Sequence, residues 1–327
     1  MTENFLGSVA VRVNNGAAEP VRCHAGGSGS QGLAPRATAA EVGGMNRMSG
    51  TRKMLVAAVV GLAVLVPAGA LSGPRDLLLI VTGMPGTTDQ ARPTVRGFLD
   101  RLGEKLGWGA AAIQGDYYPD PNVGLQQIRE RDPGFAAMSL DLYLAHGEEF
   151  EAKVIAKAVM NGRDKQRFHI VVAKEGGPAS ADALSGKVFV PFRESARFLG
   201  NLVLDGKLTL AESLELVYES NAISALRKVS RGEAVAAVVE EQVIEQFAQL
   251  PASVKDKLAV LFAGPWIPTP PVVGLTGSAA ADRTAMQTTL VGFCAGDGAE
   301  ICNSIRVNSF KAATDEDYAV VRTLWAR

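Results

Sequence analysis

Short apolar segments alternate with amphipathic ones from Leu77 to the C-terminus, and this alternation limits the possible folds more than any other feature. Residues 77–82 form a continuous apolar run, which is typical of a strand buried on both faces of a parallel sheet. Residues 92–106 place their apolar side chains on one helical face. A second series of the same kind starts at residue 187. The pattern predicts an α/β fold with two lobes, each a mixed, mostly parallel sheet flanked by helices.

The apolar pattern also predicts the individual elements. Strands are expected over residues 110–118, 135–140, 153–159, 168–174, 187–190, 214–218, 234–239, 258–263 and 272–275, and helices over residues 122–131, 194–204, 222–230 and 241–250, followed by three C-terminal helical pieces. We expect the chain to cross between the lobes more than once, with hinges near residues 171–174 and 261–265. A ligand cleft should lie between the lobes, at the carboxyl ends of the strands.

The N-terminal part of the chain differs from the rest. Residues 1–44 are rich in Gly, Ala and Ser, and we interpret them as an unstructured or mis-annotated extension, with translation starting at Met45 or Met48. Residues 45–70 contain basic residues, then a 13-residue apolar run, then small residues. This order predicts a signal peptide cleaved near Ala70, because a membrane-spanning helix needs about 20 apolar residues.

Export would place the mature chain in the periplasm, where it would not be an integral membrane protein. The alternative is a buried helix or an uncleaved anchor, but neither explains the order of residues. Removal of the leader would discard Cys23 and leave Cys294 and Cys302, eight positions apart. In an oxidising compartment we expect these two to form a disulfide, the alternative being two buried thiols.

Composition excludes several classes of function. A net charge of −1 gives no basic excess for nucleic acid, and the mature chain has too few Cys and His residues for a zinc cluster. His146 and His169 have no spacing typical of metal ligands, and no nucleophile-elbow, metalloprotease or P-loop motif is present. We therefore expect no catalytic residue, no metal and no cofactor, and the chain is predicted not to be an enzyme.

Two segments resemble a known family. Residues 184–190, LSGKVFV, and residues 230–239, SRGEAVAAVV, resemble second-lobe strands of the type 2 periplasmic solute-binding proteins of ABC transporters, in particular the phosphate/phosphonate-binding branch. The resemblance implies that residues 71–172 and 264–327 form the first lobe and residues 173–263 the second. It also implies a monomer that captures a small, anionic solute in the cleft and delivers it to an ABC permease.

One segment departs from that family's pattern. Where the phosphonate-binding branch carries a Ser/Thr-rich run, this chain has Pro191-Phe192-Arg193-Glu194-Ser195, with a single hydroxyl and an added negative charge. Phosphonate specificity therefore does not follow from the resemblance. An anionic or zwitterionic ligand held by Arg193, Ser195 and the helix dipole remains compatible with it.

The predicted ligand-binding residues follow the strand ends, where side chains would face the cleft. They are Met84, Tyr117, Ser139, Tyr143, Arg193, Ser195, Asn221, Glu240 and Trp266. Asn221 is also expected to cap the helix that follows it. Two other functions fit the same fold: a sensor or interaction domain that signals to a membrane partner, and a transferase acting on a small precursor.

Overall fold

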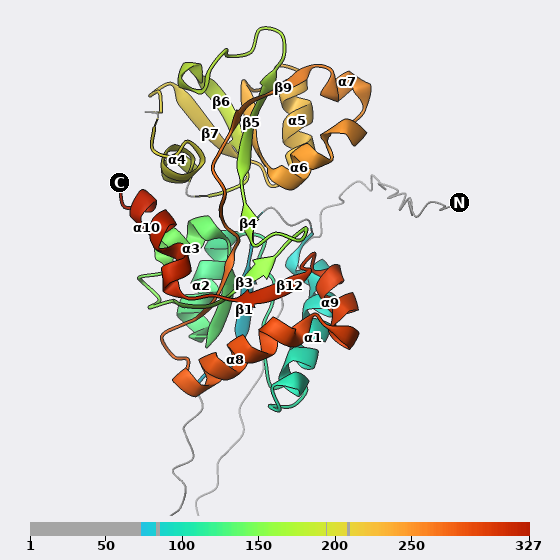
Figure 1. Cartoon of the computed structure of the whole chain (residues 1–327), viewed down its shortest axis with the longest axis vertical. Coiled ribbons are helices and arrows are strands. Elements are labelled where there is room, and N and C mark those ends of the chain that lie inside the picture. The colour runs from blue at the N-terminus through green and yellow to red at the C-terminus, as the bar shows by residue number, and fades with distance from the viewer. Residues whose placement is uncertain (1–72, 83–85, 194, 208–209) are drawn as a thin grey trace, which may run out of the picture. The chain divides into compact units, whose positions relative to one another are not determined.

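The computed structural model describes residues 73–82, 86–193, 195–207 and 210–327. The expectations for residues 1–44 and for the signal peptide at 45–70 lie outside the described residues. Within the described part of the chain, the helices are too short or too polar to cross a membrane. Two sheets with separate sets of helices organise this part of the chain (Figure 1). The two-lobed α/β fold expected from the sequence is confirmed.

The first lobe is built on a five-stranded mixed sheet. Its strands, in spatial order, are β1 (Leu77–Ile80), β2 (Phe135–Met138), β11 (Pro271–Gly274), β3 (Lys153–Val159) and β12 (Ser309–Ala312). Strands β1 and β2 are parallel, whereas β11 returns from the second lobe and inserts antiparallel between β2 and β3. The C-terminal segment adds β12 as an antiparallel edge strand. Late segments of the chain therefore complete a sheet that early segments begin.

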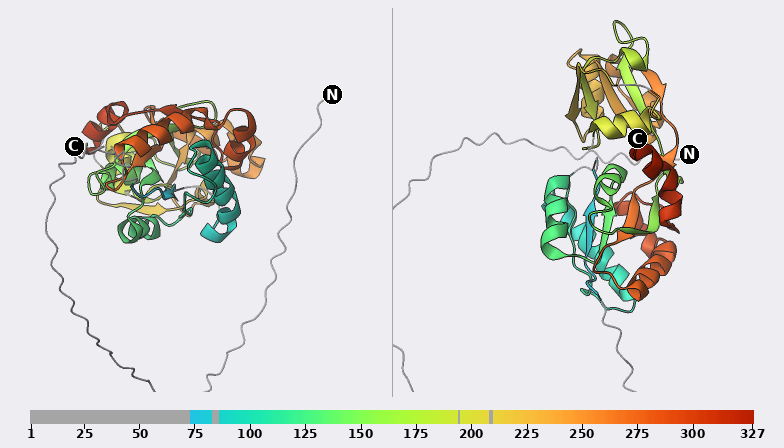
Figure 2. Two further views of the ribbon diagram at one scale, coloured as in Figure 1. Left: turned by 90° about the horizontal axis from the view of Figure 1, so that it is seen from below. Right: turned by 90° about the vertical axis from the view of Figure 1, so that its left-hand side faces the viewer.

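Helices cover both faces of this sheet (Figure 2). One face packs against α1 (Thr88–Lys105), α8 (Ala280–Phe293) and α9 (Ala299–Ser304), and the other against α2 (Pro121–Arg131) and α3 (Leu140–His146). The side chains of each strand alternate between the two cores, so that Leu77 packs on the α1 side and Leu78 on the α2 side. This alternation is why the strands are apolar along their whole length.

The second lobe has its own five-stranded sheet. Its order is β7 (Leu214–Tyr218), β6 (Gly186–Val190), β8 (Ala236–Glu240), β5 (Phe168–Ala173) and β9 (Leu258–Ala263). Strands β6, β7 and β8 are parallel, and β5 is antiparallel to both of its neighbours. Helix α5 (Ala222–Ser230) packs on one face, and α4 (Ser195–Phe198) continues into a π-helical turn on the other.

Two short strands carry the chain between the lobes. β4 (Lys165–Gln166) and β10 (Ile267–Pro268) pair antiparallel with each other, outside both large sheets. Because β5 belongs wholly to the second sheet, the first crossing precedes Phe168 and lies earlier than the hinge expected at residues 171–174. The second crossing follows the end of β9 at Ala263. The paired crossings provide the short, regular connection that a hinge between lobes requires.

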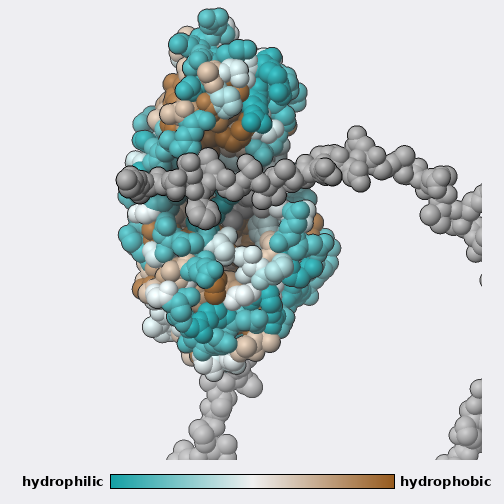
Figure 3. Space-filling view, turned by 90° about the vertical axis from the view of Figure 1, so that its right-hand side faces the viewer, coloured by the Kyte–Doolittle hydropathy of each residue, from teal (hydrophilic) through white to brown (hydrophobic). Residues whose placement is uncertain are grey.

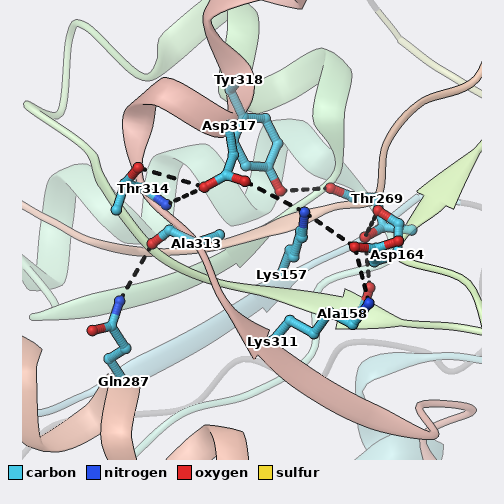
Figure 4. Close-up of polar contacts among 10 residues, drawn as sticks. All are labelled: Lys157, Ala158, Asp164, Thr269, Gln287, Lys311, Ala313, Thr314, Asp317 and Tyr318. Atoms are coloured by element: carbon cyan, nitrogen blue, oxygen red, sulfur yellow. Dashed lines mark hydrogen bonds and ion pairs between the residues drawn. The ribbon is translucent and has the colours of Figure 1, made fainter.

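A polar network fixes the crossing segments to the first lobe (Figure 4). The Thr269 hydroxyl donates to the Ala158 carbonyl over 2.5 Å, and the buried Tyr318 hydroxyl donates to the Thr269 carbonyl over 2.8 Å. Lys157 lies 3.3 Å from Asp164 and 3.5 Å from Asp317. On the face seen in Figure 3, hydrophobic residues gather mainly on the second lobe, and hydrophilic residues dominate the visible first-lobe surface.

Several elements differ from the expectation. Residues 110–113 form turns, and only the part around Tyr117 runs beside β1, through an isolated bridge to Leu79. Helix α3 and strand β12 were not expected. The expected helix at 194–204 changes to π geometry at Leu199, and the expected helix at 241–250 is split into α6 (Glu241–Glu245) and a 3-10 turn. In the structure, Cys294 and Cys302 are joined by a disulfide.

Candidate functional site

A cleft with a volume of about 760 Å³ lies between the two lobes. The first lobe contributes the loop after β1, the start of α2 and the start of α3. The second lobe contributes the loops after β6, β7 and β8. These loops all follow the carboxyl ends of strands, which is where α/β folds place their ligands. The volume lies within the roughly 300–1,000 Å³ of small-molecule sites.

Four helices begin at this cleft. Their N-cap residues all line it, and they are Asp120 of α2, Ser139 of α3, Asn221 of α5 and Glu240 of α6. Asp120 Oδ1 accepts a hydrogen bond from the Asn122 amide, and Asn221 Oδ1 accepts one from the Ser224 amide, both over 2.9 Å. A helix N-terminus carries partial positive charge and outward-pointing N–H groups. Of the four, the 11-residue α2 and the 9-residue α5 are long enough to bring such partial positive charge to the cleft.

Ser139 is the most distinctive residue of the first-lobe wall. It is 6% exposed, and its hydroxyl has no hydrogen-bond partner among the described residues. A buried polar atom without a partner costs about 1–3 kcal/mol. Because this hydroxyl lies in the wall of the cleft, a bound ligand is the natural group to satisfy it.

Arg193 and Asp141 connect the two walls of the cleft. The Arg193 backbone amide, in the second lobe, donates to Oδ2 of Asp141, in the first lobe, over 2.9 Å. Asp141 is 2% exposed. The Arg193 guanidinium lies 4.1 Å from the ring centre of Tyr218. Stacking of this kind holds a cation in place.

Glu240 is half-buried in the second-lobe wall. Burial raises the pKa of its carboxyl group, although a hydrogen bond from Gln242 opposes the shift. Burial acts in this direction because it disfavours the charged form of a carboxyl group.

The cleft brings together four of the predicted ligand-binding residues: Ser139, Arg193, Asn221 and Glu240. Tyr117 instead lines a second cavity next to the cleft. Met84 lies outside the described residues, and the side chain of Ser195 lies outside the described side chains.

Two further predicted residues lie away from the cleft lining. Tyr143 is 4% exposed and packs edge-on against Tyr318, with their ring centres 5.4 Å apart. Trp266 is 40% exposed and lies under two guanidinium groups, at 4.6 Å for Arg167 and 5.5 Å for Arg163. Both remain predictions as ligand-binding residues.

The sequence reasoning missed several residues of the cleft, including Asp120 and Tyr218. Asp120 could have been found, because an Asp followed by Pro121 is a recognisable helix start. Tyr218 gave no comparable local signal. Asp141 lies within residues 139–143, which the strand end at residue 140 had already placed at the cleft. Among the described residues, no group of three or more His, Cys, Asp or Glu side chains is placed to hold a metal ion.

Two lobes joined by paired crossing strands, with a cleft at the helix N-termini, define a two-lobed periplasmic-binding fold. The sequence model of the family described as "ABC transporter, phosphonate, periplasmic substrate-binding protein" matches residues 86–318, more than two thirds of the chain. The chain therefore belongs to this family of substrate-binding components of ABC transporters. Among curated proteins, none matches the sequence.

Solved structures share the fold at low sequence identity. The binding protein component of an ABC phosphonate transporter from Pseudomonas aeruginosa is 14% identical with a TM-score of 0.59, over 77% of this chain and 85% of that one. A Xanthomonas citri protein bound to ATP is 10% identical with a TM-score of 0.63, over 78% and 96%. PhnD1 from Prochlorococcus marinus, in complex with methylphosphonate, is 12% identical with a TM-score of 0.58, over 77% and 97%. These likenesses support the fold and leave the ligand of this chain to be determined.

Proposed function

We propose that this chain is exported, binds a small anionic solute in the cleft between its lobes and delivers it to the permease of an ABC importer. The observation that carries the anionic ligand is the buried Ser139 hydroxyl, which has no partner among the described residues and lies in the cleft at which α2 and α5 begin. Family membership supports the transport role, and the phosphonate bound by PhnD1 suggests the first ligands to test. In this role the chain releases the solute chemically unchanged, because binding and delivery include no chemical step.

The charges of the cleft support the same ligand class. Arg193 and Arg306 are the cationic side chains among its described lining residues. Of the three acidic residues there, Asp120 and Asp141 accept backbone N–H groups, and Glu240 has a raised pKa. Backbone N–H groups therefore partly offset two of the three carboxyl groups, and burial disfavours the charged form of the third.

Ser139→Ala tests the ligand class directly. In the unliganded protein the change removes a hydroxyl that has no partner among the described residues, so the melting temperature should not fall. In the complex it removes a hydrogen bond to the ligand, worth about 0.5–1.5 kcal/mol or roughly a 2- to 13-fold loss of affinity. Isothermal titration calorimetry with methylphosphonate, phosphate and sulfate measures both the ligand preference and the loss.

The matched control is Ser230→Ala, which removes an exposed hydroxyl at the end of α5, away from the cleft. Its affinity should equal that of the parent protein. If none of the three anions binds, or if Ser139→Ala binds them as tightly as Ser230→Ala does, the anionic site is wrong.

Export and delivery need separate measurements. We expect the periplasmic form to begin at Leu71, after cleavage at Ala70, and N-terminal sequencing of that fraction checks this. Uptake of the labelled solute should require both this chain and an ABC permease. Light scattering should show a monomer with and without solute.

A further inference from the structure

A second cavity, of about 530 Å³, lies inside the first lobe. We call it the apolar cavity, and its wall includes Leu79, Val95, Phe98, Ala137, Val272 and Phe310. It lies between the first sheet and the helices α1, α8 and α9, and so it is distinct from the cleft between the lobes. A water-filled cavity needs several polar partners, and this wall supplies few.

The packing of the sheet shows that the apolar cavity is a real gap in the core. Leu77 and Phe135 are register partners on β1 and β2, and they are 2% and 0% exposed. One pair further along the same face, Leu79 and Ala137 are also register partners, yet both are only partly buried. Strands covered by helices normally have their side chains buried along the whole strand. On this face of the sheet, the side chains are buried at one end of the strands and only partly buried at the end nearer the cleft.

The apolar cavity adjoins the cleft. Val81, Gly86, Met160 and Pro270 line both. The two spaces therefore share a boundary formed by these residues.

We propose that the natural solute is amphipathic, with an anionic head at the helix N-termini of the cleft and an aliphatic or aromatic substituent in the apolar cavity. This inference rests on the proposed function, because it takes the anionic head from there. A bare inorganic anion would leave the apolar cavity empty. An apolar substituent would fill it and cover the partly exposed side chains of Leu79 and Ala137.

A homologous series of n-alkylphosphonates, from methyl to octyl, tests the proposal by titration calorimetry on the purified full-length chain. Each buried methylene contributes about 0.8 kcal/mol, which is roughly a fourfold decrease in Kd. We expect this decrease at each step until the cavity is filled. If methylphosphonate binds and the longer members bind no tighter, the amphipathic ligand is refuted and the proposed function stands. If no member binds but phosphate or sulfate does, the amphipathic ligand is refuted and the proposed function stands. If none of these anions binds, both are refuted.

A rim variant ties the effect to the apolar cavity. Thr94 lines the cavity from an exposed position on α1, so Thr94→Phe narrows the space without burying a polar group. It should abolish the gain in affinity with chain length. The matched control is Thr288→Phe, the same change at an exposed position on α8 that lines neither space, and it should keep the gain.

If Thr94→Phe does not fold, Ala137→Val makes a smaller change on the floor of the cavity and should move the affinity plateau to shorter chains. Equal chain-length dependence in the folded variant and in Thr288→Phe would overturn the proposal.

Discussion

The disulfide between Cys294 and Cys302 offers a sharp test of how the first lobe is held together. Cys294 caps the end of α8, and Cys302 lies in α9, where its side chain is 0% exposed. The loop between them contains Asp297, which pairs with Arg101 and Lys105 of α1. The bridge therefore fixes α9 to α8 and keeps the loop against α1. We expect a Cys294→Ala/Cys302→Ala double variant to fold with lower stability.

The size of the effect follows from the length of the loop. The two cysteines are separated by 8 positions. Closing a loop of that length removes roughly 8 cal/mol/K of unfolded-chain entropy, or about 2.5 kcal/mol at 25 °C. In a chain of this size, that corresponds to a decrease in melting temperature of about 5–10 °C. Urea denaturation of the full-length chain measures the free energy of unfolding directly, and thermal denaturation checks the shift.

The double variant also controls for effects of the reductant that do not involve this disulfide. Reduction with dithiothreitol should destabilise the parent protein by the same amount and leave the variant unchanged. Equal unfolding free energies for the oxidised and reduced parent protein would refute the argument. Because Ser304 and Ile305, just beyond the bridge, line the apolar cavity, reduction should also weaken the gain in affinity with alkyl chain length.

Three further changes test the polar groups. A hydrogen bond from Arg167 lowers the pKa of Glu241 to about 2, so its stabilisation is present above the unfolded pKa and is lost as pH falls from about 4.5 towards 2. Glu241→Gln should therefore cost at most about 3 kcal/mol at pH 7 and flatten acid denaturation over that range. Burial raises the pKa of Glu240, so the charge on this residue lowers the free energy of unfolding as pH rises above the unfolded pKa. Glu240→Gln should melt at a higher temperature than the parent at alkaline pH, with the difference disappearing near pH 4. Tyr318→Phe removes the buried bond to the Thr269 carbonyl and should cost about 1–2 kcal/mol in urea denaturation, with an unchanged m-value.

The elements that the sequence predicted well are those set by local apolar runs. Strands β3, β7 and β9 and helix α5 have the expected bounds, because an apolar run or an amphipathic period marks each of them in a short window. Helix α3 was missed because Ser139 is the single residue that separates its apolar residues from those of β2. β12 was missed because it is a short edge strand that depends on pairing with β3.

The candidate site shows the same division. Ser139, Arg193, Asn221 and Glu240 were found because each follows a strand end, and the topology brings such positions to one edge. Tyr143 follows Ser139 by one turn of α3, and that turn carries its ring away from the cleft and under Tyr318. Because helix α3 was not predicted, the sequence could not show that Ser139 lines the cleft and that Tyr143 does not.

The two strand–helix series, the helix cap at Asn221 and the family resemblance could be read from the amino-acid sequence, because each depends on residues close together in the chain. The completion of the first sheet by late segments, and the meeting of four described helix starts at one cleft, follow from the fold. It alone showed that Leu79 and Ala137, 58 positions apart, form the open floor of a cavity. Such a gap depends on how closely the covering helices approach the sheet, and no local pattern of residues records that distance.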